Sequence, residues 1–195
     1  AQHTYNLTGV ELTTLTGQSK DAVPALIDGN TYTLTLDGTD LADNGAVTVM
    51  YAGIIYDTTA PGFGSVTPVT GAYVKTDTRV VVWTNSENIT AGTVTYTKTA
   101  GAADTASPHV VSMAGKLTLG AQSTDVTGLV DGATYTLSLV STDSAGNVSN
   151  AFSNAGINYD TSVPLFGSVT PADNAYVNAT TQTVTFTLNE SLQNG

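Results

Sequence analysis

Residues 31–36 read TYTLTL and residues 134–139 read TYTLSL, so the same stretch returns after 103 residues (134 minus 31). Further stretches return at the same offset: YDTTAP at 56–61 as YDTSVP at 159–164, FGSVTP at 63–68 and again at 166–171, and AYV at 72–74 and again at 175–177. Similarity at a fixed spacing is the signature of a tandem array. We therefore divide the 195 residues into the back part of one module (1–55), a complete module (56–158) and the front part of a further module (159–195).

Within the complete module, apolar and polar residues alternate in short segments rich in Thr, Val and Tyr, and clusters of Gly, Asn, Asp and Pro separate them. This pattern predicts short antiparallel strands. The segments lie near residues 63–67, 79–85, 93–98, 109–113, 122–127, 133–142 and 152–158. Seven short strands in about 100 residues match an immunoglobulin-like or fibronectin-III-like sandwich. We predict an all-β chain of tandem seven-stranded sandwiches of this kind.

Two aromatic positions support the sandwich. Tyr135 follows a tight Asp-Gly turn at the start of the sixth predicted strand, and Tyr32 occupies the same place one repeat earlier. This placement predicts a tyrosine corner, in which the phenol binds the backbone of the turn. Trp83 alternates with Val81 along a predicted strand, which favours a core position over a sugar-stacking one.

The composition excludes several classes of function. The chain has 16 acidic and 5 basic residues, for a net charge of -11, so it would repel nucleic acid and anionic membrane surfaces. Its longest apolar runs have the length of strands, so we expect no membrane insertion. The absence of cysteine excludes thiolate catalysis, thiolate zinc sites and disulfides. Neither His3 nor His109 has an acidic residue beside it, and no nucleophile elbow is present, so we expect no enzyme.

One longer stretch resembles a known family. Residues 131–147 read DGATYTLSLVSTDSAGN, and residues 157–164 read INYDTSVP. Together they are similar to the tandem immunoglobulin-like modules of giant bacterial surface adhesins. The resemblance implies an extracellular stalk at the bacterial cell surface, whose modules bind calcium where they join.

The positions of the acids also predict a metal site. Four acidic positions recur at the offset of 103 residues: Asp28 with Asp131, Asp40 with Asp143, Asp57 with Asp160, and Glu87 with Glu190. In a seven-stranded sandwich the incoming linker and the loops after the second and sixth strands lie at one end. That end would gather Asp57, Glu87, Asp143 and the amide of Asn147. An all-oxygen set of this kind suits Ca²⁺.

We expect a partial copy of this site at Asp160 and Glu190. Among all the predicted ligands, the turn acids Asp28 and Asp131 are the weakest members. The alternative is that all these acids are ordinary turn and loop residues, because aspartate before a turn commonly caps it.

Three functions fit these features. The first is a structural stalk repeat of an adhesin or surface filament, with joints stiffened by calcium. The second is a ligand-recognising module that binds a glycan through its loops, and the third is an ancillary spacer domain of a secreted enzyme.

The two partial modules match complementary parts of the complete one. We therefore expect a composite sandwich in a head-to-tail array, formed within one continuous chain or by strand exchange between adjacent chains.

Overall fold

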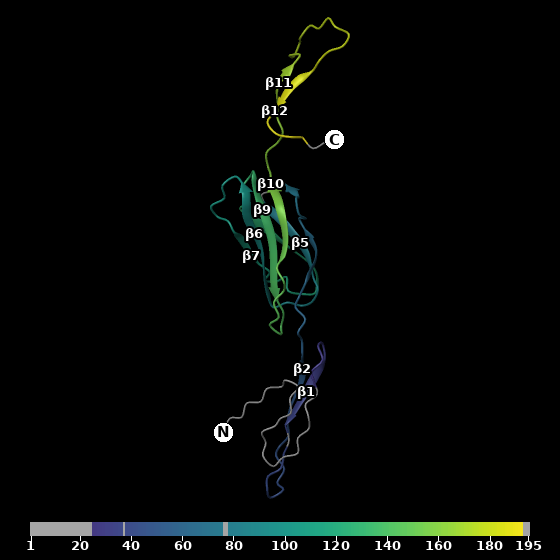
Figure 1. Cartoon of the computed structure of the whole chain (residues 1–195), viewed down its shortest axis with the longest axis vertical. Coiled ribbons are helices and arrows are strands. Elements are labelled where there is room, and N and C mark those ends of the chain that lie inside the picture. Colours follow the sequence, from purple (N-terminus) through teal and green to yellow (C-terminus); the bar gives the residue numbers. More distant parts are fainter. Residues whose placement is uncertain (1–24, 37, 76–77, 193–195) are drawn as a thin grey trace.

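The computed structural model describes residues 25–36, 38–75 and 78–192, and within these ranges every regular element is a strand. The first six strands are β1 (Thr31–Leu36), β2 (Val49–Ile55), β3 (Phe63–Thr67), β4 (Tyr73–Val74), β5 (Thr78–Asn85) and β6 (Ala91–Gly101). The next six are β7 (His109–Ser112), β8 (Gly120–Thr127), β9 (Ala133–Thr142), β10 (Phe152–Tyr159), β11 (Phe166–Thr170) and β12 (Thr185–Leu188). Strands β3 to β10 gather in the middle of Figure 1, the β1–β2 pair lies toward one end of the long axis, and the β11–β12 pair lies toward the other.

We call residues 56–158, which carry most of strands β3 to β10, the central unit. Its strands form two sheets, one of order β3-β5-β8 and one of order β4-β10-β9-β6-β7. Neighbouring strands in both sheets are antiparallel, except that β4 runs parallel to β10. Outside the central unit, β1 pairs with β2 and β11 pairs with β12, each as an antiparallel hairpin.

The buried core draws residues from both sheets of the central unit. Alternate residues of β9 are buried along its whole length, and Val81 and Trp83 of β5 are fully buried in the other sheet. The indole nitrogen of Trp83 donates a 2.8 Å hydrogen bond to Oδ1 of the buried Asn85. This alternation is consistent with a β-sandwich, because each strand turns one face toward the core and the other toward solvent.

The strand predictions hold closely, with one correction. The stretches predicted at 63–67 and 133–142 are the observed ranges of β3 and β9, and the others differ by one to three residues at their ends. The structure adds β4, a two-residue strand, so the central unit has eight strands rather than the predicted seven. Tyr73–Val74 is too short to show an alternating pattern, and its pairing with β10 comes from the tertiary fold.

Local backbone features recur at the offset of the sequence repeat. Ser65 and Ser168 both have φ of 49°, and each lies in a register shift, Ser65 where β3 pairs with β5 and Ser168 where β11 pairs with β12. The tyrosine corner is confirmed in both copies. The backbone N–H of Val130 donates to the Tyr135 hydroxyl at 2.8 Å, and that of Ile27 donates to the Tyr32 hydroxyl at 2.6 Å.

Among the described residues, no helix is long and apolar enough to cross a membrane.

Candidate metal centre

Three carboxylates meet where the chain enters the central unit. Asp57 lies in the linker between β2 and β3, Glu87 in the loop between β5 and β6, and Asp143 directly after β9. One carboxylate oxygen from each residue lies within 4.8 Å of the other two. The sequence predicted this meeting of the linker with the two loops, and the structure places the three side chains accordingly.

The spacing of these oxygens fits one calcium ion. Ca²⁺ binds oxygen at roughly 2.3–2.6 Å, so two ligand oxygens on opposite sides of it are separated by about 5 Å at most. The three acids therefore lie close enough to share an ion. Among the side chains that the structure describes, no Lys or Arg forms an ion pair with them, so their negative charge has no protein counter-charge at contact distance.

The electrostatics show the cost of this arrangement. Burial raises the pKa of Glu87, and the negative charges of Asp57 and Asp143 raise it further, with a smaller contribution from Asp28. Like charges at short range disfavour ionisation, and a bound cation reverses the effect. The site is thus built from groups that repel one another without a cation.

Asp143 is held in place by its own turn. Its side chain is buried, and Oδ1 accepts hydrogen bonds of 2.8 Å from the backbone N–H groups of both Ala145 and Asn147. Burial acts to raise the pKa of Asp143, but the hydrogen bonds from Asn147 and Ala145 outweigh it and leave the pKa below its ordinary value. The turn therefore keeps this carboxylate charged and fixed.

Asp40 occupies the same kind of turn one repeat earlier. Its Oδ1 accepts from the N–H groups of Ala42 and Asn44 at 2.8 and 2.9 Å, and its Oδ2 accepts from the Asn44 amide at 2.8 Å. Hydrogen bonds from Asn44, its side chain first, lower the pKa of Asp40. Asp40 belongs to no group of three acids at metal-binding distance within the described part of this chain.

Asn147 reaches the cluster as a hydrogen-bond donor. Its Nδ2 donates to Oδ2 of Asp143 at 2.8 Å and to the backbone oxygen of Asp57 at 3.1 Å. Ligation of a cation through Oδ1 would require the amide plane to turn over, so in this conformation Asn147 ties the linker to the loop.

Asp28 and Asp131 each form hydrogen bonds to a linker that lies 30 residues further along the chain. Oδ1 of Asp28 accepts from the Thr58 N–H at 2.5 Å and from the Thr58 hydroxyl at 2.8 Å. Asp131 makes the same pair of contacts with Thr161 one repeat later. Hydrogen bonds, led by the Thr59 hydroxyl for Asp28 and the Thr161 N–H for Asp131, lower the pKa of each carboxyl. Their role as turn and linker caps, which the sequence left open, is the one that these contacts support.

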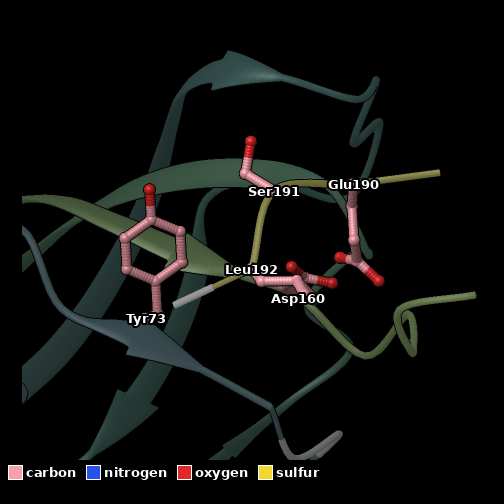
Figure 2. A pocket seen from close by; sticks show the side chains of 5 residues that line it. All are labelled: Tyr73, Asp160, Glu190, Ser191 and Leu192. Atoms are coloured by element: carbon pink, nitrogen blue, oxygen red, sulfur yellow. The ribbon is translucent and has the colours of Figure 1, made fainter. Parts of the chain in front are cut away.

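Asp160 and Glu190 come together where the chain leaves the central unit. Both line a pocket of about 460 Å³ with Tyr73, Ser191 and Leu192, and Figure 2 shows the two carboxylates lying near each other. Oε1 of Glu190 is buried and has no hydrogen-bond partner among the described residues. The two acids repeat Asp57 and Glu87, but the described residues contribute no third carboxylate at metal-binding distance here.

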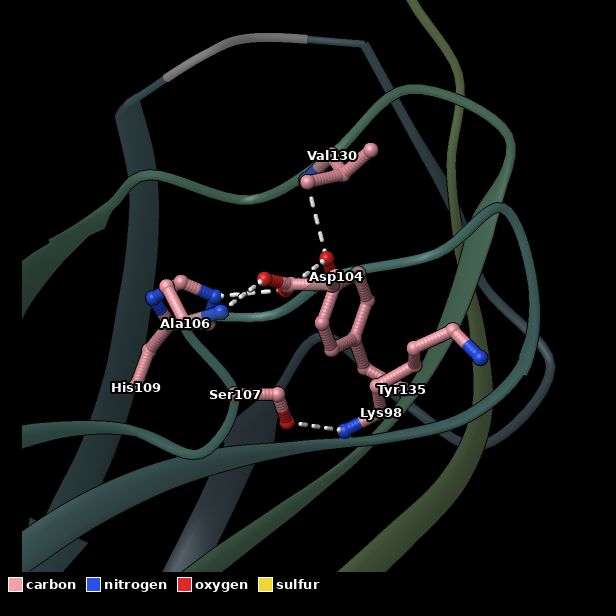
Figure 3. Close-up of polar contacts among 7 residues, drawn as sticks. All are labelled: Lys98, Asp104, Ala106, Ser107, His109, Val130 and Tyr135. Carbon is pink, nitrogen blue, oxygen red and sulfur yellow. Dashed lines mark hydrogen bonds and ion pairs between the residues drawn. The ribbon is translucent and has the colours of Figure 1, made fainter.

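A second acidic centre was not anticipated from the sequence. Oδ2 of Asp104 lies 2.7 Å from Nε2 of His109 and 2.7 Å from the Tyr135 hydroxyl, and Figure 3 shows its carboxylate between the two rings. The Asp104 side chain is 1% exposed. The expectation that His109 has no acidic partner is therefore wrong: the loop between β6 and β7 folds back and brings Asp104 to it.

This network is largely buried, because the side chains of His109 and Asp104 are only 11% and 1% exposed. Burial is the largest influence on Asp104 and acts to raise its pKa, but hydrogen bonds from His109, Tyr135 and Ala106 together hold the pKa below its ordinary value. One signal in the sequence pointed to this network. A buried phenol needs a hydrogen-bond partner beyond the turn backbone, so the Tyr135 hydroxyl required a further partner.

No protein-family model matches the chain, and a comparison with curated proteins found no match either.

Proposed function

We propose that the chain is a stretch of stalk repeats from an extracellular bacterial adhesin or surface filament, in which calcium closes the joints between immunoglobulin-like modules. The observation that carries the proposal is the cluster of Asp57, Glu87 and Asp143 at a joint. A spacer needs no catalytic or recognition cleft, but it does need control over the angle between successive modules. The cluster lies where that control would act.

The order of the strands supports the immunoglobulin-like assignment. Sheets of order β3-β5-β8 and β10-β9-β6-β7 correspond to the two sheets of an immunoglobulin-like sandwich, with β4 as an additional edge strand beside β10. The tyrosine corner at Tyr135 lies at the start of the strand where such domains carry it.

The chemistry of the joint follows from the charges. Without calcium, repulsion among the three carboxylates loosens the contact between the linker and the two loops. A bound Ca²⁺ would draw Asp57 of the linker toward Glu87 and Asp143 and restrict the joint to few angles. Asp28 and Asn147 support this geometry, because they hold the linker backbone from opposite sides of the joint.

The proposed location outside the cell rests on the resemblance. Calcium sites of extracellular modules bind with dissociation constants of roughly 10⁻⁴ to 10⁻³ M, and we expect this cluster to bind in that range. The absence of cysteine leaves the redox compartment undecided.

The experiment is a calcium titration of the 195-residue chain by calorimetry, combined with thermal unfolding in calcium and in chelator. We expect dissociation constants in the range above, and a stabilisation of about 2.7 kcal/mol at calcium concentrations near 100 times the dissociation constant. Glu87→Gln and Asp143→Asn should each weaken binding, whereas Asp125→Asn, on an exposed acid of β8, should leave it unchanged. Identical melting with and without chelator would exclude a calcium site in this chain.

A further inference from the structure

The last strand of the central unit runs beside a segment from the beginning of the same unit. Among the described strands, β4 and β10 form the one parallel pair, and every other pairing is antiparallel. The contact extends beyond the two residues of β4. Backbone N–H groups donate to backbone oxygens at 2.8–2.9 Å from Gly71 to Ala155, from Asn158 to Ala72 and from Asp160 to Val74.

A side chain adds a fourth hydrogen bond to this contact. Nδ2 of Asn154 donates to the backbone oxygen of Pro68 at 2.8 Å. Residues 68–74 are therefore held along residues 154–160, and we call the pairing of these two segments the parallel contact.

A bulge in β10 makes room for the parallel contact. The register of β10 against β9 shifts between Asn154 and Ile157, and Gly156 lies within the shift with φ of 69°. A Cβ on Gly156 would lie 3.8 Å from the backbone nitrogen of Gly71, so the two backbones pass close to each other there. A bulge turns backbone groups away from the strand beside it. In β10 it frees the oxygen of Ala155 to accept from Gly71.

The directions of the two strands decide how they respond to tension along the chain. The preceding part of the chain reaches β4 at its N-terminal end, through β3, and the following part leaves β10 at its C-terminal end. In Figure 1 these two parts extend from opposite ends of the central unit. Tension therefore pulls β4 and β10 in opposite directions along one axis. The strands must slide past each other, so all the hydrogen bonds between them are loaded together.

The place of the parallel contact in the chain protects the strands between its two segments. Residues 75–153 carry strands β5 to β9 and lie between the two segments in sequence. While residues 68–74 stay bound to residues 154–160, tension passes directly from one segment to the other. Strands β5 to β9 then lie outside the path of the force, apart from the load that β5 takes from its pairing with β3.

We propose that the central unit bears tension along the chain, and that the parallel contact is the element that resists it. This function goes beyond the proposed calcium joint, because the contact contains none of the three clustered acids. The resistance is a kinetic property, since forced unfolding is governed by the unfolding rate and not by the equilibrium stability.

The test stretches single molecules of the whole chain in two directions. Pulling by the two ends loads the parallel contact by sliding. The chain has no cysteine, so Lys75→Cys with Val163→Cys provides two unique attachment points just beyond the contact, at its C-terminal end. Pulling between these points separates β4 from β10 one hydrogen bond at a time. We expect the unfolding force to be about four times larger in the first direction, where four bonds share the load.

The length gained on unfolding identifies the event. About 100 residues at 3.3–3.6 Å each replace a folded body about 40 Å long, so unfolding of the central unit should lengthen the molecule by roughly 300 Å. Equal unfolding forces in the two directions for events of this length would overturn the proposal.

A pair of variants tests the assignment to the parallel contact. Asn154→Ala removes the bond to Pro68, one of the four, and should lower the unfolding force for end-to-end pulling by about a quarter. Ser153→Ala, on the exposed neighbouring residue of β10, is the matched control and should leave the force unchanged. A force that Asn154→Ala lowers no more than Ser153→Ala does would contradict the assignment.

Measurements in calcium and in chelator separate this inference from the proposed function. A large end-to-end unfolding force that persists in chelator supports the parallel contact, whether or not the chain binds calcium. A force that is large only in calcium overturns the inference and places the resistance at the Asp57 cluster. A small force in a chain that binds calcium overturns the inference and leaves the calcium joint standing.

Discussion

The hydroxyl of Tyr135 donates a 2.7 Å hydrogen bond to Oδ2 of Asp104, although 31 residues separate them in the chain. The same hydroxyl accepts a 2.8 Å hydrogen bond from the N–H of Val130. Tyr135 thereby joins three segments: its own strand β9, the turn before that strand, and the loop between β6 and β7. Burial raises the pKa of Tyr135, and the hydrogen bond to the Asp104 carboxylate together with its negative charge raises it further, to about 12. The phenol therefore stays a donor at any physiological pH.

Tyr135→Phe should destabilise the central unit by about 2 kcal/mol, because it removes both hydrogen bonds and leaves the buried Asp104 carboxylate short of a donor. Denaturant unfolding measures the loss. Tyr176→Phe is the control, since the Tyr176 side chain is fully exposed, and it should change stability little. An equal loss in both variants would mean that the network contributes nothing.

Asp104 should make the stability of the central unit depend on acid pH. Because its folded pKa lies below its ordinary value of 3.8, the stabilisation is present above that value and is lost as the pH falls through the folded pKa. Asp104→Asn removes this contribution. The difference in unfolding free energy between the unaltered chain and the variant should therefore be largest near neutral pH and shrink on acidification. A difference that stays constant with pH would contradict the assignment.

Gly101 and Gly115 form a matched pair that separates backbone strain from steric clash. Both have positive φ, at 75° and 76°, but a Cβ on Gly101 would clash with the backbone oxygen of Gly132, whereas a Cβ on Gly115 would have no atom within 4 Å. Gly115→Ala should cost about 1 kcal/mol from the left-handed conformation alone. Gly101→Ala should cost about 3 kcal/mol or more, because β6 must move away from the turn before β9. Thermal unfolding of the two variants compares them directly, and equal losses would show that the backbone approach is not tight.

On acidification, calcium affinity should begin to fall at a higher pH than the ordinary pKa of glutamate predicts. Burial and the neighbouring acids raise the pKa of Glu87, so in the absence of a cation the folded chain gains stability as the pH falls and Glu87 takes up its proton. Calcium binding requires the ionised form and opposes this uptake. Titrations at a series of pH values should show that calcium affinity begins to decline at a pH above 4.5, the ordinary pKa of glutamate. Glu87→Gln should remove that decline and stabilise the calcium-free chain, and a pH-independent affinity would place the ion elsewhere.

The strands were predictable because their pattern is local. Strand β9 alternates buried and half-buried residues through all 10 positions, and that alternation is visible in the sequence as Tyr135, Leu137 and Leu139 separated by polar residues. Strand β4 was missed because two residues carry no period, and its pairing with β10 depends on where the chain happens to pass.

The acidic residues show the same contrast between what a local pattern predicts and what the tertiary fold decides. Asp57, Glu87 and Asp143 were predicted together because they recur at the repeat offset and because strand order places their loops at one end. The sequence ranked Asp28 and Asp131 as the weakest ligands but left their role open, because that role depends on which linker amides and hydroxyls their oxygens reach.

By itself, the sequence determined the 103-residue repeat spacing, the strands of the central unit, the tyrosine corner and the meeting of Asp57, Glu87 and Asp143, because each follows from a local period or from a fixed repeat spacing. Only the tertiary structure decided that Asp104 lies between His109 and Tyr135 and that Asn147 donates to the linker. The physical reason is that burial and side-chain pairing depend on which distant segments pack together, and no spacing along a single chain specifies that.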